Sequence, residues 1–133
     1  MNRPATTRRR GLAATEFAVC LPVLMLLLLG SLECCSMIFL KQSISVAAYE
    51  GAHKALLPGA TAAEAEAAAM AVLADRGVRG GQATAAGGNL GAVAAGDYFT
   101  VVVSAPTDQN RVVPLRFFGA SRLSATATFM KEF

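Results

Sequence analysis

The stretch "FAVCLPVLMLLLLGSL", residues 17–32, decides how this chain is organised. It holds no charged side chain, and counted through Glu33 to Leu40 it grows to about 24 residues. As a helix, 24 residues cover about 36 Å, which exceeds the ~30 Å of a bilayer's hydrocarbon core. We therefore predict one transmembrane helix, in which Pro22 removes a hydrogen bond and is expected to cause a kink.

Basic residues lie on the leading side of this stretch: Arg3, Arg8, Arg9 and Arg10 precede it, and the next one is Lys41. Because positive flanks stay in the cytoplasm, the N-terminus is predicted to be cytoplasmic and the C-terminal body to lie outside. Cleavage as an ordinary secretion signal fits less well. The apolar run is longer than the usual ~7–15 residues, and no clean small-x-small site follows it.

The charge balance of the body differs from that of the whole chain. The 133 residues have a formal net charge of +3, but beyond Gly11 eight Lys or Arg residues meet nine Asp or Glu residues. The body of the protein therefore has no excess of basic residues of the kind that binds nucleic acid. Charged residues make up only 16% of the chain, against about 25% in soluble domains, and 54% are hydrophobic.

All three cysteines, Cys20, Cys34 and Cys35, lie in the apolar block. Cysteines placed in this way do not form a disulfide framework, and their spacing is not that of metal ligands. We interpret them as small apolar residues of a membrane helix. An intermolecular bridge near the outer end of the helix is the alternative.

Two carboxylates flank the apolar stretch. Glu33 lies about 24 Å along the helix axis from Phe17, near the outer headgroups, where the ~2.5–3.5 kcal/mol cost of a carboxylate at the helix centre falls. We expect Glu33 to be interfacial, with a buried partner as the alternative.

Glu16 lies at the inner membrane edge. A cut after Gly11 would make Leu12 the first residue and create an α-amine with a pKa near 8. An opposite charge ~4 Å away contributes about 4 kcal/mol at an effective dielectric constant of 20. We expect Glu16 to pair with such an amine, from its own chain or from a neighbouring subunit, which would favour lateral packing of helices.

The N-terminal part of the chain, residues 8–57, resembles the TadE-like pseudopilins, minor components of tight-adherence (Flp-type, type IVc) pilus systems. The features that carry the resemblance span residues 8–57: the basic residues Arg8 to Arg10, Gly11, Glu16 with Phe17, Leu21 with Pro22, Glu33, and Glu50 with Gly51. The tail "LSATATFMKEF" resembles the family more weakly. Phe17 replaces the Tyr that related pilins often have.

The resemblance implies cleavage between Gly11 and Leu12 by a prepilin peptidase, and a role for Glu16 and Phe17 in assembly. Its implied partners are the lipid bilayer and other pilin or pseudopilin subunits, at a pilus base, initiation or tip complex. The implied location is the inner membrane, with the C-terminal domain periplasmic or extracellular and possible incorporation into the pilus.

The rest of the chain indicates a small α+β domain. The first helix is expected to run over residues 12–57, with Ile44, Ala47, Ala48, Ala52 and Leu56 on one face, and to stop at Pro58 and Gly59. A capping box of Thr61 and Glu64 opens a second helix, whose inner face should carry Met70 and Leu73 and which should end near Arg76 and Gly77.

Strands are predicted at residues 98–104 and 123–130, with a weak edge strand near 80–86 in a glycine-rich loop. The first should turn Phe99, Val101 and Val103 to one face, and the second should turn Leu123, Ala125, Ala127 and Phe129 to the helices. Between them, Pro106 and Pro114 make a long connection that holds Phe117 and Phe118, of which at least one should be in the core.

The sequence contains no residue pattern that indicates an enzyme active site. The single histidine, His53, lies near Glu50 on the first helix, where a solvated pair is the ordinary interpretation. No serine lies in a glycine elbow, and the outer domain is small for a substrate pocket. We expect no enzyme activity, cofactor, metal or small-molecule substrate.

The resulting hypothesis has three parts: a basic leader (1–11), the transmembrane segment of a long helix (12–40) and an outer TadE-like domain with a second helix and a small antiparallel sheet (41–133). The predicted function is a minor pseudopilin of a tight-adherence pilus. The alternative is an uncleaved, signal-anchored envelope protein that binds another partner.

Overall fold

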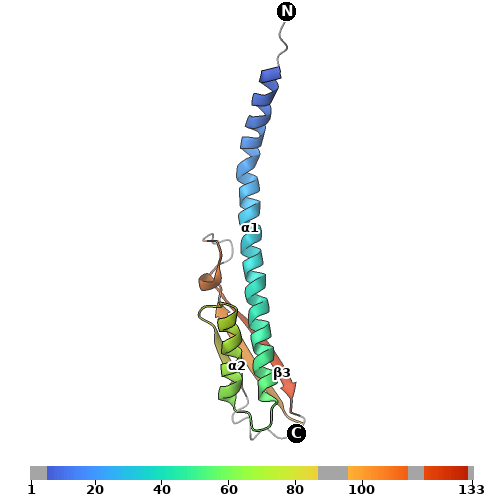
Figure 1. Ribbon diagram of the computed structural model, residues 1–133, viewed down its shortest axis with the longest axis vertical. Coiled ribbons are helices and arrows are strands. Elements are labelled where there is room, and N and C mark those ends of the chain that lie inside the picture. Colours follow the sequence, from blue (N-terminus) through green and yellow to red (C-terminus); the bar gives the residue numbers. More distant parts are fainter. Residues whose placement is uncertain (1–5, 87–95, 114–118, 132–133) are drawn as a thin grey trace, which may run out of the picture.

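The computed structural model shows one long helix whose second half is covered by a second helix and a three-stranded sheet (Figure 1). It describes the backbone of residues 6–86, 96–113 and 119–131, and side chains from Gly11 onward. The predicted α+β class is confirmed. The predicted positions of Phe117 and Phe118, and that of Pro114, lie outside the described residues.

Helix α1 spans Thr6–Ala55, and its helical conformation continues through Pro22. Its second half presents the predicted apolar face, with Ile44, Ala47, Ala48 and Ala52 buried and Leu56 partly buried beyond the helix end. The helix ends two residues earlier than predicted. Pro58 follows this end, and Gly59 has φ +76°, a conformation that turns the chain.

Helix α2 spans Ala62–Asp75 and begins with the predicted capping box. The Glu64 backbone N–H donates to Thr61 Oγ1 over 3.3 Å, and the Thr61 N–H donates to Glu64 Oε2 over 2.9 Å. Leu73 is buried as predicted, but the prediction for Met70 is wrong, because its side chain is 41% exposed. The buried stripe runs through Ala65, Ala69 and Leu73, so alanines fill the helix contact that Met70 was expected to make.

The sheet has the order β1-β2-β3, and both pairings are antiparallel. Its strands are β1 (Gln82–Ala86), β2 (Tyr98–Pro106) and β3 (Arg122–Met130). The weak edge strand near 80–86 is therefore confirmed as β1. A short 3-10 helix, η2 (Asp108–Asn110), follows β2.

The alternation predicted for the strands is confirmed. In β2 the buried side chains include Phe99, Val101 and Val103, and in β3 the odd-numbered positions from Leu123 to Phe129 are less exposed than their neighbours. These faces pack on α1 and α2 and form one core with the buried alanines of the helices.

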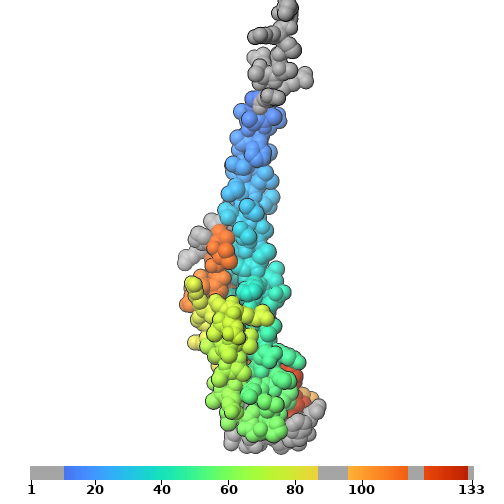
Figure 2. Space-filling view, viewed as in Figure 1, coloured from blue at the N-terminus to red at the C-terminus, as the bar shows by residue number. Residues whose placement is uncertain are grey.

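Small residues allow α1 and α2 to approach closely. A Cβ added at Gly51 would lie 2.9 Å from the Ala65 carbonyl oxygen and 3.1 Å from the Ala69 Cβ. The first half of α1 has no such cover, and Figure 2 shows it projecting as a single helix away from the globular part, which we call the head (residues 33–131).

Candidate functional site

The projecting part of α1 is the first feature of functional interest. Residues 11–32 are exposed, except that Leu29 and Gly30 are half-buried. The helix from Gly11 to Ala55 contains a window of mean hydropathy 2.3 of which nothing is buried, and it is one candidate membrane span by length and composition. An apolar surface of this kind is stable in lipid and costly in water.

The predicted processing residues lie at the free end of this helix. Leu12 is 63% exposed, and its carbonyl accepts a hydrogen bond from the Thr15 hydroxyl over 2.7 Å. Gly11 has open space around it, since a Cβ there would meet nothing within 4 Å. Of the side chains described, from Gly11 onward, none packs over Gly11, and cleavage at the Gly11–Leu12 bond stays a prediction.

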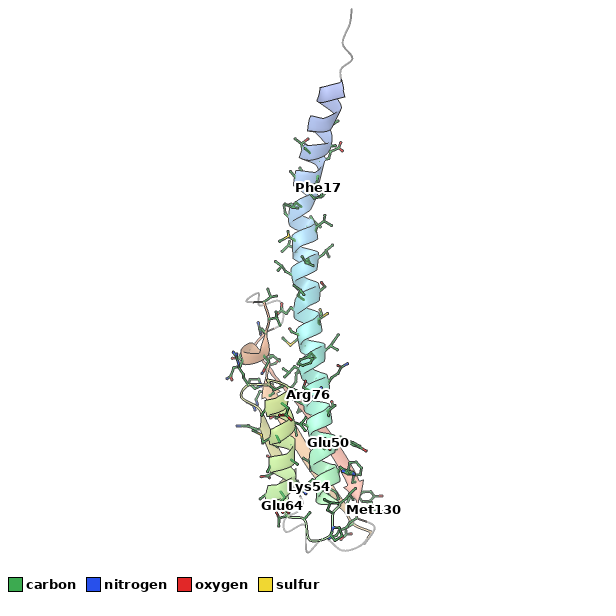
Figure 3. All side chains as sticks on the ribbon, in the orientation of Figure 1. Phe17, Glu50, Lys54, Glu64, Arg76 and Met130 are labelled. Carbon is green, nitrogen blue, oxygen red and sulfur yellow. The ribbon has the colours of Figure 1, made fainter. Side chains whose placement is uncertain are left out.

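Glu16 and Phe17 lie one turn further along α1. Glu16 is exposed, and Phe17 is 60% exposed and projects from the helix (Figure 3). Four residues separate Leu12 from Glu16, so the two share one face of the helix. Among the side chains that the structure describes, none forms an ion pair with Glu16. The pairing with an amine and the kink at Pro22 both remain predictions.

Glu33 marks the point where the head begins. The expectation of an interfacial Glu33 is wrong: its side chain is fully buried, and the alternative of a buried partner is the one the structure shows. The guanidinium Nη1 of Arg111 lies 3.6 Å from Glu33 Oε1, and the Arg111 side chain is only 7% exposed.

The surroundings of this ion pair tie the loop after η2 to α1. Nη2 of Arg111 donates to the Gly119 carbonyl over 3.2 Å. The Ser36 hydroxyl, itself buried, donates to the Glu33 carbonyl over 2.7 Å. The pair therefore fastens the head to α1 one residue after the exposed segment ends.

Sequence reasoning did not single out Arg111, but a signal for the burial of Glu33 was present. Glu33 lies seven residues before Leu40 and eleven before Ile44, which places it on the same helical stripe as the core. A carboxylate on a buried stripe needs a cationic or hydrogen-bonding partner.

The other polar candidates do not gather into a site. His53 stacks on Tyr49 with ring centroids 6.3 Å apart, while Glu50 is exposed on the same helix. Cys20, Cys34 and Cys35 are free and exposed. Within residues 6–86, 96–113 and 119–131, no group of three or more His, Cys, Asp or Glu side chains is arranged to hold a metal ion.

Comparison with known proteins adds one match. The family model described as TadE-like protein matches residues 11–53, which include the exposed segment, Glu33 and Gly51. No curated protein and no solved structure matches this chain. Residues 11–53 of α1 are therefore similar to TadE-like proteins, as the sequence predicted, and the exposed apolar half of this helix indicates a single-pass membrane protein.

Proposed function

We propose that this chain is a minor pseudopilin, cleaved between Gly11 and Leu12 by a prepilin peptidase and assembled with other pilin-type subunits. The proposal is carried by one observation: an exposed apolar helix bears a carboxylate at the fifth residue after the candidate cleavage point and a compact head at its other end. The TadE-like family is a structural pilus family, which fits a subunit with no catalytic role.

The length of the exposed helix supports membrane insertion up to the head. Residues 12–32 rise about 32 Å as a helix, close to the ~30 Å of the hydrocarbon core. Residues 1–11 are then the leader. The membrane segment lies within residues 12–40, and the outer domain follows. The arginines of the leader favour a cytoplasmic N-terminus and a periplasmic or extracellular head.

The carboxylate of Glu16 favours association of this helix with the helix of another protomer. A carboxylate at the membrane edge is poorly solvated, and a new amine on Leu12 of a neighbouring protomer supplies the opposite charge. Because Glu16 and Leu12 share a face, a stagger of about one turn between two parallel helices brings the carboxylate of one protomer toward the amine of the other.

The test of this function uses the full chain in cells that assemble the pilus. We expect N-terminal sequencing of the mature protein to begin at Leu12, and Glu16→Ala to insert in the membrane but to be missing from sheared pili. Glu50→Ala is the matched control, because it removes an exposed carboxylate of the same helix within the head. Normal incorporation of Glu50→Ala is expected.

The alternative is an uncleaved, signal-anchored envelope protein that binds another partner. A retained arginine leader, together with unchanged pilus output from Glu16→Ala, would support this alternative and overturn the pseudopilin proposal.

A further inference from the structure

A cavity of about 440 Å³ lies where the head meets the exposed part of α1. One wall is α1, with Leu32 and Phe39, and the other wall is formed by the residues after α2 and by η2 with the residues after it. The second wall carries three guanidinium groups, from Arg76, Arg79 and Arg111. The volume is within the ~300–1,000 Å³ range of cavities that bind small ligands.

The charge of the cavity is positive. Arg111 is matched by Glu33, but among the described residues neither Arg76 nor Arg79 forms an ion pair. The acidic residues closest along the chain, Asp75 and Asp108, do not line the cavity. Two exposed guanidinium groups therefore remain available for an anion.

The cationic wall is held in place by backbone hydrogen bonds. After helix α2 ends at Asp75, Gly77 has φ +67°, and the N–H of Val78 donates to the Leu73 carbonyl over 2.9 Å. The Asn110 side chain then joins the two loops: Oδ1 accepts from the Arg79 N–H over 2.8 Å, and Nδ2 donates to the Arg79 carbonyl over 2.9 Å.

The opposite wall continues the surface that faces lipid. Leu32 is the last residue of the exposed segment and is 42% exposed, and Phe39, two turns later, is 53% exposed. The cavity thus presents cations and apolar side chains together at the level where the head begins. Figure 3 shows Arg76 at the end of α2 nearest the projecting helix, with Lys54 and Glu64 at the far end of the head.

We propose that this cavity binds the headgroup of an anionic phospholipid from the outer leaflet of the membrane that α1 spans. Arg76 and Arg79 contact the phosphate through charge-assisted hydrogen bonds, Phe39 lies beside the headgroup, and the acyl chains run past Leu32 into the bilayer. The proposal rests on the membrane insertion of α1 in the proposed function, but not on cleavage or on pilus assembly.

The test measures lipid retention by the full chain. The protein is reconstituted in vesicles of equal phosphatidylglycerol and phosphatidylcholine, extracted in mild detergent and analysed by native mass spectrometry. We expect one retained phosphatidylglycerol per chain. The double variant Arg76→Gln/Arg79→Gln should retain at least about tenfold less, because it loses both phosphate contacts.

The matched control is Lys54→Gln/Arg122→Gln, which removes the same charge from two exposed residues that do not line the cavity. Its retention should equal that of the wild type, and Arg76→Gln/Arg79→Gln should have the melting temperature of the wild type. Equal losses in both double variants would mean unspecific attraction of lipid to a basic protein, and would overturn the proposal.

Inorganic phosphate distinguishes the two sources of the anion. Displacement of the lipid by millimolar inorganic phosphate would indicate a site for a soluble phosphate and would overturn the lipid assignment. A chain that retains phosphatidylglycerol but never enters a pilus would overturn the proposed function alone. A chain that assembles with no retained lipid would overturn the lipid site alone.

Discussion

Glu33 of α1 and Arg111 of the loop after η2 form an ion pair that is almost completely buried, with Nη1 3.6 Å from Oε1. The two residues are 78 positions apart in the chain, so the contact closes the head onto the helix at the end of the exposed segment. The ion pair therefore lies at the boundary between the head and the exposed segment of α1.

Removal of one partner of this pair should destabilise the head strongly. We expect Glu33→Ala to lower the free energy of unfolding by about 3–5 kcal/mol, because Arg111 is left as a buried charge without its carboxylate. The measurement is denaturant unfolding of the full chain in detergent. Glu50→Ala, at an exposed position of the same helix, should change stability by less than about 0.5 kcal/mol.

The double variant Glu33→Leu/Arg111→Met separates the ion pair from simple loss of packing. Since it removes both charges, it should recover most of the stability lost in Glu33→Ala. Loss in the double variant as large as in the single variant would contradict a cost that arises from the uncompensated charge.

Local patterns were enough to predict most of the fold. The alternation of β3, the Thr61–Glu64 capping box and the apolar face from Ile44 to Ala52 are each encoded within a few residues. These elements formed where they were predicted because no distant contact competed with the local preference.

What sequence reasoning missed depends on distant partners. Met70 was expected inside because it is large and apolar, but the close approach at Gly51 leaves room only for Ala65 and Ala69. Glu33 was treated as a residue of the membrane surface alone, because its partner lies in a loop whose position no local pattern defines.

The contact at Gly51 makes a prediction about the approach of α1 and α2. Gly51→Ala should destabilise the head by about 1–3 kcal/mol, because the new methyl group meets the Ala65 carbonyl oxygen at 2.9 Å. This cost exceeds the ~1 kcal/mol that alanine gains over glycine in helix propensity.

Gly30→Ala is the matched control in the same helix, since a Cβ there meets nothing within 4 Å. It should be neutral or stabilising in the same unfolding experiment. If both substitutions raised the stability, the proximity of the two helices at Gly51 would be refuted.

The capping box makes a prediction about pH. The Thr61 backbone N–H, and then its hydroxyl, donate to the Glu64 carboxylate and hold the pKa of Glu64 below its ordinary value of 4.5. A lowered pKa in the folded state means that ionised Glu64 stabilises α2 above pH 4.5. This contribution is lost as the pH falls through the lowered value.

Carboxyl carbon NMR of the full chain in detergent measures this titration directly. We expect Glu64 to titrate below pH 4.5 in the wild type and closer to 4.5 in Thr61→Ala, which removes the hydroxyl donor. A Glu64 titration that is the same in both proteins would show that the hydroxyl of Thr61 has no part in the shift.

The last prediction concerns Asn110, which binds two backbone groups of the loop after α2 and one at the end of β2. Its Nδ2 donates to the Pro106 carbonyl over 2.7 Å in addition to its two bonds with Arg79. Asn110→Ala should lower the free energy of unfolding by about 1–3 kcal/mol, because these groups lose their partner where they are partly shielded from water. It should also weaken retention of phosphatidylglycerol, since the cationic wall is no longer held against η2.

Gln109→Ala, a substitution of the exposed neighbour, should leave the stability within about 0.5 kcal/mol of the wild type. Equal stability of the two variants would show that the side chain of Asn110 does not hold the loops together.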